Sequence, residues 1–215
     1  MLTLSHARRA LRAFPRLPAI PAYPPALWAT RLCSSYTVDD DVPDGVTVVN
    51  TLAAAKKAAA QLMSAPSGVF HAADTEVADI DVTVESPVGH GRVVVLSVYS
   101  GPDMDFGSGP KLWIDTAAHP EILPQFKPWL ESPQHLKVWH NYSFDKHVLG
   151  NHGIQVKGLG GDTMHMARLW STARAKKGGY SLEGLSADIL KARKMPMKVC
   201  VSLGGVCWHA GRFWL

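Results

Sequence analysis

The sequence predicts an α/β fold in which helices flank a mixed β-sheet. Three segments have the alternating or continuous apolar pattern of neighbouring strands: Val69–Glu76, Arg92–Tyr99 and Lys111–Ile114. Polar loops separate them, which suits an antiparallel meander. Helix-like and strand-like segments alternate after the third strand. The length of 215 residues and the hydrophobic content of 47% provide for one globular core with tails.

Two elements precede the meander. Val46–Val49 is a short strand candidate. Thr51–Met63 is rich in alanine and predicts a helix, with Asn50 or Thr51 as its N-cap. The run Ser-Ala-Pro-Ser-Gly over residues 64–68 then ends that helix before the first long strand begins.

Four helices and one strand are predicted after the meander. The strand is Leu136–His140, and Lys176–Gly179 is a basic joint between the last two helices. The expected helices are Pro120–Leu130, Ser143–Asn151, Thr163–Arg174 and Ser181–Lys191. This order of elements fits an α/β sandwich like that of ribonuclease H, with catalytic acids on the central strand.

The two ends of the chain differ in charge from its middle. Residues 1–38 and 191–215 each hold five basic residues and no acid, which leaves 12 basic against 18 acidic residues between them. The body is therefore acidic, and the net charge of +4 is not evidence for nucleic-acid binding. No apolar run is long enough for a transmembrane helix, so we expect no membrane insertion. Cys33, Cys200 and Cys207 lack disulfide or zinc-site spacing.

Residues 1–38 resemble an organellar transit peptide in composition. They combine arginine, alanine, proline and serine with a lack of acids, and an amphipathic stretch opens the segment. An attached unstructured basic tail is the alternative. Residues 39–45 form an acidic, proline-containing linker. The segment therefore predicts an organellar location, with mitochondrion and plastid both open.

Asp74 and Glu76 are the first candidates for chemistry. They lie two residues apart on a predicted strand, so their side chains leave the same face and can share one cation. Two negative charges this close repel each other, and each raises the pKa of the other. A divalent ion relieves this repulsion. An Asp-x-Glu pattern at a solvated strand end is the bland alternative.

Asp145 is the third candidate. It falls in the first turn of the helix after Leu136–His140, from which it can reach the Asp74 and Glu76 site. Asn141 lies at the strand-to-helix junction, where its amide can fix the loop or contact a phosphate. A helix N-terminal acid stabilised by the helix dipole is the alternative for Asp145.

Taken together, these segments resemble the proofreading 3′–5′ exonuclease domain of family A DNA polymerases. The motifs are Val-Phe-His-Ala-Ala-Asp-Thr-Glu over residues 69–76, Val-Trp-His-Asn-Tyr-Ser-Phe-Asp over 138–145, Gly-Asp-Thr-Met over 161–164 and Tyr-Ser-Leu over 180–182. The similarity covers about residues 45–198 and is closest to the plant organellar enzymes related to bacterial DNA polymerase I.

The resemblance implies a fold, a site and a substrate. The fold is ribonuclease H-like, in the DEDD exonuclease superfamily. Asp74, Glu76 and Asp145 would be catalytic residues and ligands of two Mg²⁺ or Mn²⁺ ions. The substrate would be a single-stranded DNA 3′ end, held by Val77, Ile80, Asn141 and Phe144.

The chain departs from the family's pattern in its last part. The third motif, a Tyr followed four residues later by an Asp, is absent after the Ser181–Lys191 segment, and residues 199–215 match nothing expected there. The site and the C-terminal part of the fold are then incomplete, and the polymerase domain is absent. Three interpretations follow: an exonuclease within residues 46–198, a truncated remnant that at most binds nucleic acid, and a ribonuclease of the same superfamily.

Other residues receive structural interpretations. Asp162 is expected to cap the helix that begins at Thr163, with catalysis as its alternative. The remaining residues are listed by expected role: core packing for Trp113, Trp129 and Trp139; structural or solvent-facing positions for His140, His147, His152 and His165; and a solvated basic helix end or phosphate contacts for Arg168, Arg174, Lys176 and Lys177.

Overall fold

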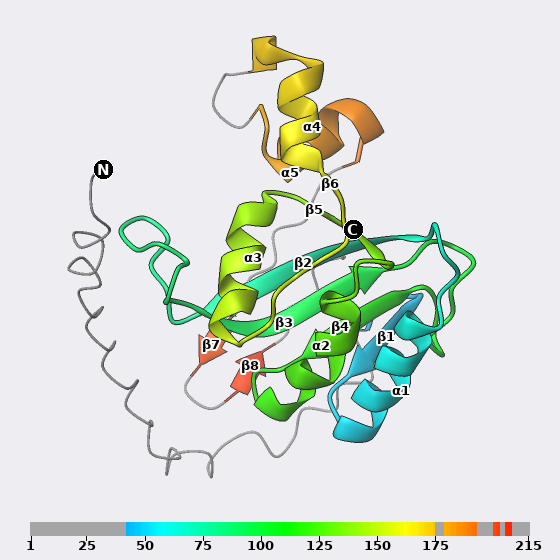
Figure 1. Ribbon diagram of the computed structural model, residues 1–215. Helices are drawn as coiled ribbons and strands as arrows, with labels where there is room; N and C mark the ends of the chain where they lie inside the picture. Colours follow the sequence, from blue (N-terminus) through cyan, green and yellow to red (C-terminus); the bar gives the residue numbers. More distant parts are fainter. Residues whose placement is uncertain (1–41, 175–178, 193–199, 203–204, 208–215) are drawn as a thin grey trace, which may run out of the picture. The chain divides into compact units, whose positions relative to one another are not determined.

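A six-stranded mixed sheet forms the centre of the protein, as the computed structural model shows (Figure 1). The structure describes residues 42–174, 179–192, 200–202 and 205–207, so the predicted transit peptide and residues 39–41 of the acidic linker lie outside the described residues. The strands are β1 (Val46–Val49), β2 (Phe70–Ala78), β3 (Arg92–Tyr99), β4 (Lys111–Asp115), β5 (Leu136–Trp139) and β6 (Leu159–Asp162), in the order β1-β4-β3-β2-β5-β6. The predicted α/β class is confirmed.

The predicted meander is β2, β3 and β4, which pair antiparallel. The other strands pair parallel, β1 with β4, β5 with β2 and β6 with β5. Strand β2, which carries Asp74 and Glu76, is therefore interior to the sheet, as expected for the strand that bears the acids.

Strand β6 was not predicted, because its sequence Leu-Gly-Gly-Asp lacks an apolar pattern. The glycines instead permit close packing of this edge strand. A Cβ on Gly160 would lie 3.0 Å from Phe70 and 3.1 Å from Leu136, tighter than ordinary contacts. The space beside β5 thus admits this strand only if the residue at position 160 is small.

Two of the predicted helices are confirmed, and a proline-rich one differs in type. Helix α1 (Leu52–Met63) is capped by Thr51, whose hydroxyl accepts the Ala54 N–H at 3.2 Å, and α3 spans Tyr142–Asn151. The predicted helix Pro120–Leu130 is wrong in type. It is a 3₁₀ helix, η2 (Pro120–Phe126), followed by one turn, α2 (Lys127–Leu130), because the prolines at 120, 124 and 128 cannot donate backbone hydrogen bonds.

The two C-terminal helices are shorter than predicted. Helix α4 (Thr163–Trp170) ends at the extended Ser171, and η3 (Thr172–Arg174) follows as a separate 3₁₀ turn. Helix α5 (Leu182–Leu185) continues into a π-helical turn, η4 (Ser186–Leu190). No helix among the described residues combines the length and apolar character needed to cross a bilayer.

The last two described strands form a second, two-stranded sheet. Within the described residues, β7 (Cys200–Ser202) and β8 (Gly205–Cys207) pair only with each other, antiparallel. The remainder of the divergent segment 199–215 lies outside the described residues.

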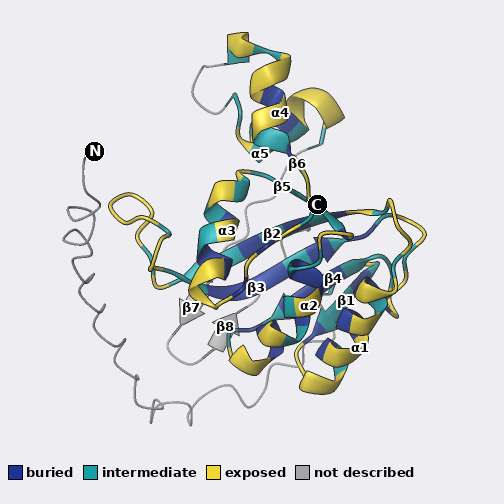
Figure 2. Cartoon of the chain, viewed as in Figure 1, coloured by how far each residue is buried: buried dark blue, intermediate teal, exposed yellow. Residues whose placement is uncertain are grey.

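Two apolar clusters of different size lie among the described residues. The large cluster joins α1, η2, α2 and α3 to one side of the strands, and the small one contains Val46, Val95 and Trp113 (Figure 2). Trp113, Trp129 and Trp139 are all buried, as predicted. Because side chains alternate along a strand, Ala73, in the large cluster, and the buried Thr75 share one face of β2, whereas Asp74 and Glu76 leave the other.

Asp162 joins the N-terminal ends of two helices. Its Oδ1 accepts the N–H groups of Met164 and His165 at the start of α4, which confirms the predicted cap. Its two oxygens also accept the N–H groups of Asn141 (3.1 Å) and Tyr142 (2.8 Å) at the start of α3. Burial alone would raise the pKa of Asp162, but these backbone donors outweigh it and lower the pKa.

Replacing Asp162 by alanine is expected to reduce the free energy of unfolding by about 2–3 kcal/mol, because two helix ends lose their acceptor. Asp162→Asn, which keeps one acceptor oxygen, is expected to cost about half as much. Urea unfolding at pH 7 checks both values. Equal losses for the alanine and asparagine variants would contradict this assignment.

Candidate active site

Strand β2 extends beyond its neighbour β5 at the point where the acids lie. The pairing of β2 with β5 covers only Phe70–Ala72, whereas its pairing with β3 continues to Ala78. One edge of β2 is therefore open to side chains from Ala73 onward. Asp74 and Glu76 pair with Ser97 and Val95 of β3, without an irregularity between them, so they project from the same face as predicted.

Asp145 fills part of this open edge. It lies in the first turn of α3 and is 3% exposed. Its Oδ1 accepts the backbone N–H of Thr75 at 3.0 Å and the Thr75 hydroxyl at 2.6 Å. The carboxylate of α3 is thereby fixed to the residue between Asp74 and Glu76.

The surroundings of Asp145 disfavour its charge. Burial is the largest cause of a raised pKa, the hydrogen bond from the Thr75 hydroxyl opposes it, and the negative charge of Asp74 raises it further, to about 7. Desolvation and a like charge together create a place where a proton or a cation is favoured. Perturbed carboxylates of this kind are enriched at functional sites.

The residues predicted to hold the substrate lie on three segments: β2, the loop that follows it and the start of α3. Asn141 is exposed and left-handed (φ 67°), and its side chain makes no capping bond to α3. Phe144 and Val77 are half-buried against the large apolar cluster. Ile80 lies beyond β2, where its side chain would be 3.4 Å from a Cβ on Gly91. Their roles toward a nucleotide stay predictions.

The structure joins two of the three predicted metal ligands through Thr75 and an electrostatic contact. Asp145 bonds Thr75 and is close enough to Asp74 for that charge to raise its pKa. No group of three or more His, Cys, Asp and Glu side chains among the described residues is arranged to hold an ion. The gathering of Asp74, Glu76 and Asp145 around metal therefore stays a prediction.

Thr75 is the residue of the candidate site that the sequence analysis missed. A β-branched residue inside a strand is ordinarily interpreted only as a strand former. The feature that could have identified Thr75 is its position between two acids, with its side chain on the opposite face of the strand. A hydroxyl on that face is available to a carboxylate from a covering helix, which is the contact that Asp145 makes.

The other predicted residues have structural partners. His140 shares a hydrogen bond with the Thr163 hydroxyl (2.8 Å), as expected of a structural histidine. Arg174 bonds Asp188 (2.6 Å) and the Gly179 carbonyl. Arg168 lies over the ring of Tyr180. Lys176 and Lys177 lie outside the described residues.

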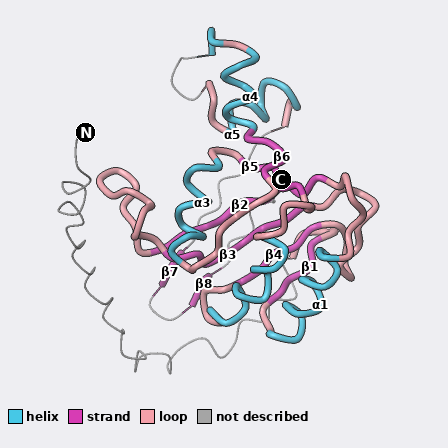
Figure 3. Tube along the Cα trace, in the orientation of Figure 1, coloured by secondary structure: helices cyan, strands magenta, loops and turns pink. Residues whose placement is uncertain are grey.

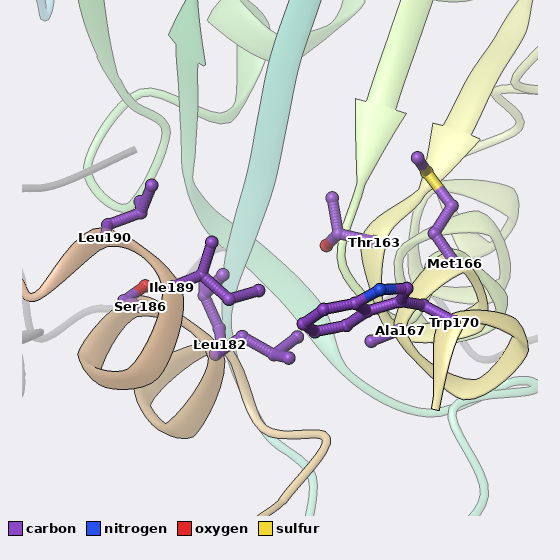
Figure 4. A pocket seen from close by; sticks show the side chains of 9 residues that line it. Thr163, Met166, Ala167, Trp170, Leu182, Ser186, Ile189 and Leu190 are labelled. Atoms are coloured by element: carbon purple, nitrogen blue, oxygen red, sulfur yellow. The ribbon is translucent and has the colours of Figure 1, made fainter. Parts of the chain in front are cut away.

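A pocket of about 360 Å³ lies between α4 and the α5–η4 segment, and its lining excludes it as the site of metal chemistry. Figure 4 shows Trp170 reaching from α4 toward Leu182 and Ile189. Thr163 and Ser186 are the polar residues of the lining, and the remainder are apolar. No carboxylate or imidazole lines it, so it lacks a group that could bind an ion or activate water.

The metal-free protein is expected to lose stability as the pH rises from about 4 to about 7. The folded-state pKa of Asp145, about 7, lies above its ordinary value of 3.8. Its contribution to stability is therefore fully present below about pH 4 and is lost as the pH rises to about 7. A shift of this size corresponds to about 4 kcal/mol.

Asp145→Asn is expected to flatten this dependence and to be the more stable protein at pH 8, because the amide oxygen still accepts from Thr75 without a charge. Urea unfolding in EDTA at several pH values checks it. Parallel profiles for the two proteins would contradict the assignment to Asp145.

Comparison with known proteins gives close sequence relatives. The chain is 48% identical over 148 residues to DNA polymerase I A, chloroplastic/mitochondrial, of Arabidopsis thaliana, and 49% identical over 150 residues to DNA polymerase I B, mitochondrial, of Oryza sativa subsp. japonica. Each match covers 67% of this chain and 14% of the relative. The chain thus spans about a seventh of the relatives' length. Their organellar names agree with the location predicted from residues 1–38.

Solved structures support the fold. The catalytic core of RRP6 from Trypanosoma brucei, mutant C496S, matches 79% of this chain and 41% of its own with a TM-score of 0.55 and 13% identity. The POL domain of Pol1 from M. smegmatis, in complex with DNA primer-template and dNTP, matches 68% and 23% with a TM-score of 0.51 and 16% identity. A family model described as 3′–5′ exonuclease matches residues 46–202, and the chain therefore belongs to the 3′–5′ exonuclease domains of family A DNA polymerases.

Proposed function

We propose that this domain removes nucleotides from DNA 3′ ends by hydrolysis of the terminal phosphodiester, in mitochondria, plastids or both. The observation that carries the proposal is the attachment of Asp145 to Thr75, the residue between Asp74 and Glu76. This contact joins the first two motifs of the exonuclease family in three dimensions. The relatives with organellar polymerase names support a role in replication or repair.

The donor set suits Mg²⁺ or Mn²⁺. Asp74, Glu76 and Asp145 offer carboxylate oxygens, which hard divalent cations prefer, and the raised pKa of Asp145 marks a place where positive charge is favourable. When bound, two such ions polarise the scissile phosphodiester and generate a nucleophilic hydroxide. The protein's own part is to hold the carboxylates at the end of β2 and to exclude solvent around Asp145.

The proposed substrate residues contact different parts of the terminal nucleotide. Asn141, exposed at the start of α3, contacts a phosphate or fixes the terminal nucleotide. Phe144, Val77 and Ile80 supply apolar surface to its base and sugar. A single-stranded end suits such a site, because an unpaired base is free to stack on side chains.

A binding domain with impaired catalysis is the second candidate. The observation that favours it is that residues 182–202, the last part of the stretch that the family model matches, contain no Tyr-x-x-x-Asp sequence. In the family that Asp binds the water-activating ion and the Tyr orients the water. A site without them loses orders of magnitude in rate.

The test is digestion of a 5′-labelled single-stranded DNA by the 215-residue chain with Mg²⁺ or Mn²⁺, beside the same sequence as RNA. We expect a ladder that shortens from the 3′ end. Asp74→Ala/Glu76→Ala is expected to lower the rate at least about 100-fold, because the ions lose two ligands. Glu121→Ala is the matched control, since Glu121 is an exposed acid remote in sequence from the motifs.

Each outcome assigns one function. A ladder that the double substitution abolishes supports hydrolysis by three carboxylates, and preference for RNA would replace DNA as the substrate. Binding of the labelled DNA, measured by fluorescence anisotropy, without cleavage by the folded protein would support the binding domain. Neither cleavage nor binding would refute both candidates.

A further inference from the structure

The β2–β3 pairing has an irregularity directly beside Glu76. Glu76 pairs with Val95, but the next residue of β2, Val77, pairs with Val93. Val94 is therefore an extra residue on β3, a β-bulge. Bulges bend a strand and redirect the side chains beside them. The direction of Glu76 at the candidate site consequently depends on what keeps this bulge in place.

Two residues outside the β2–β3 pair satisfy the backbone groups of the bulge. The Val93 N–H donates to Nε2 of His152 at 3.1 Å. Thr116 makes the other contacts. Its hydroxyl donates to the Val93 carbonyl (2.8 Å), and its N–H donates to the Val94 carbonyl (2.9 Å). The bulge is thus held from β4 on one side and from the end of α3 on the other.

Helix α3 connects this bulge to the rest of the site. His152 is its C-cap, and Asp145 in its first turn bonds Thr75. The neighbouring Asn151 holds the β2–β3 loop, accepting the Gly89 N–H (2.9 Å) and donating to the His90 carbonyl (2.7 Å). Figure 3 shows the path of α3 beside β2 and β3. One helix therefore contacts β2 at its start and the β2–β3 hairpin at its end.

We propose that His152 is a positioning residue for the exonuclease site, acting through the Val93 N–H to hold the bulge that directs Glu76. The inference rests on the proposed function, since Glu76 is there a metal ligand. The ring must present the Nε2 lone pair to Val93, so the proton of the neutral imidazole lies on Nδ1. Loss of this acceptor leaves the Val93 N–H without its partner and removes one of the contacts that hold the bulge.

The substitution His152→Leu removes the acceptor at similar size, and His152→Gln restores an acceptor oxygen. His152 is exposed, so neither change leaves a hole in the apolar core. His119→Leu is the matched control, because His119 is an exposed histidine whose ring contacts Glu121 and not β2 or β3.

Two measurements on the full chain test the proposal. In metal-free protein, amide hydrogen exchange of Val93 and the amide resonances of Glu76 and Val77 are compared by NMR. In the nuclease assay, the Mn²⁺ concentration for half-maximal cleavage is measured. His152→Leu is expected to speed Val93 exchange at least about tenfold, shift the Glu76 and Val77 resonances, and raise the Mn²⁺ requirement about tenfold, as for other residues that orient metal ligands. His152→Gln is expected within about threefold of the wild type.

The NMR comparison separates failure of this inference from failure of the proposed function. Unchanged Val93 exchange and Glu76 resonances in His152→Leu overturn the positioning role, whether or not the wild type cleaves DNA. A cleaving wild type whose Mn²⁺ requirement is unaltered by His152→Leu overturns it as well. If the wild type neither cleaves nor binds Mn²⁺, the proposed function fails. In that case, Glu76 resonances that shift in His152→Leu but not in His119→Leu still support the control of Glu76 by His152.

Discussion

The double hydrogen bond from Thr75 to Asp145 is the constraint on which the site depends. A carboxylate that is 3% exposed needs donors, and the open edge of β2 supplies an N–H and a hydroxyl from one residue. That edge is open because β5 pairs only with Phe70–Ala72. The length of β5 therefore decides whether an acid from α3 can reach Thr75, the residue between the two acids of β2.

The start of α3 is fixed by a second acid with the opposite electrostatic character. Asp162 receives backbone N–H groups from α3 and α4, and its pKa is lowered, whereas the pKa of Asp145 is raised to about 7. One carboxylate is thus committed to holding two helices together, and the other retains a strong preference for a proton or a cation. The two pKa shifts distinguish the acid that joins two helices from the proposed metal ligand more clearly than their sequence positions do, since Asp162 ends β6 and Asp145 lies in the helix that follows β5.

Local patterns predicted the elements that depend on local preferences. The bounds Arg92–Tyr99 of β3 were predicted correctly, because a segment this rich in valine favours a buried central strand. Strand β6 and the type of η2 were not predictable in this way, because glycine packing against Phe70 and Leu136 and the effect of internal prolines depend on neighbours. The shared face of Asp74 and Glu76 followed from periodicity alone, but the place of Asp145 relative to them needed either a family resemblance or the fold, since a contact across 70 residues leaves no local signal.

The electrostatics of Asp145 also constrain how the site can take up metal. Near neutral pH its carboxyl is about half protonated in the metal-free protein, so an ion that binds there displaces a proton. At the proposed metal site, affinity would rise with pH until Asp145 is fully ionised, because burial and the nearby Asp74 charge disfavour the empty carboxylate. A bound ion would offset this cost of ionisation, which is about 4 kcal/mol for a shift of this size. A site of this kind gains from two carboxylates on a rigid strand and one on a helix, because the strand fixes the spacing of the pair while the helix sets how deeply the third is buried.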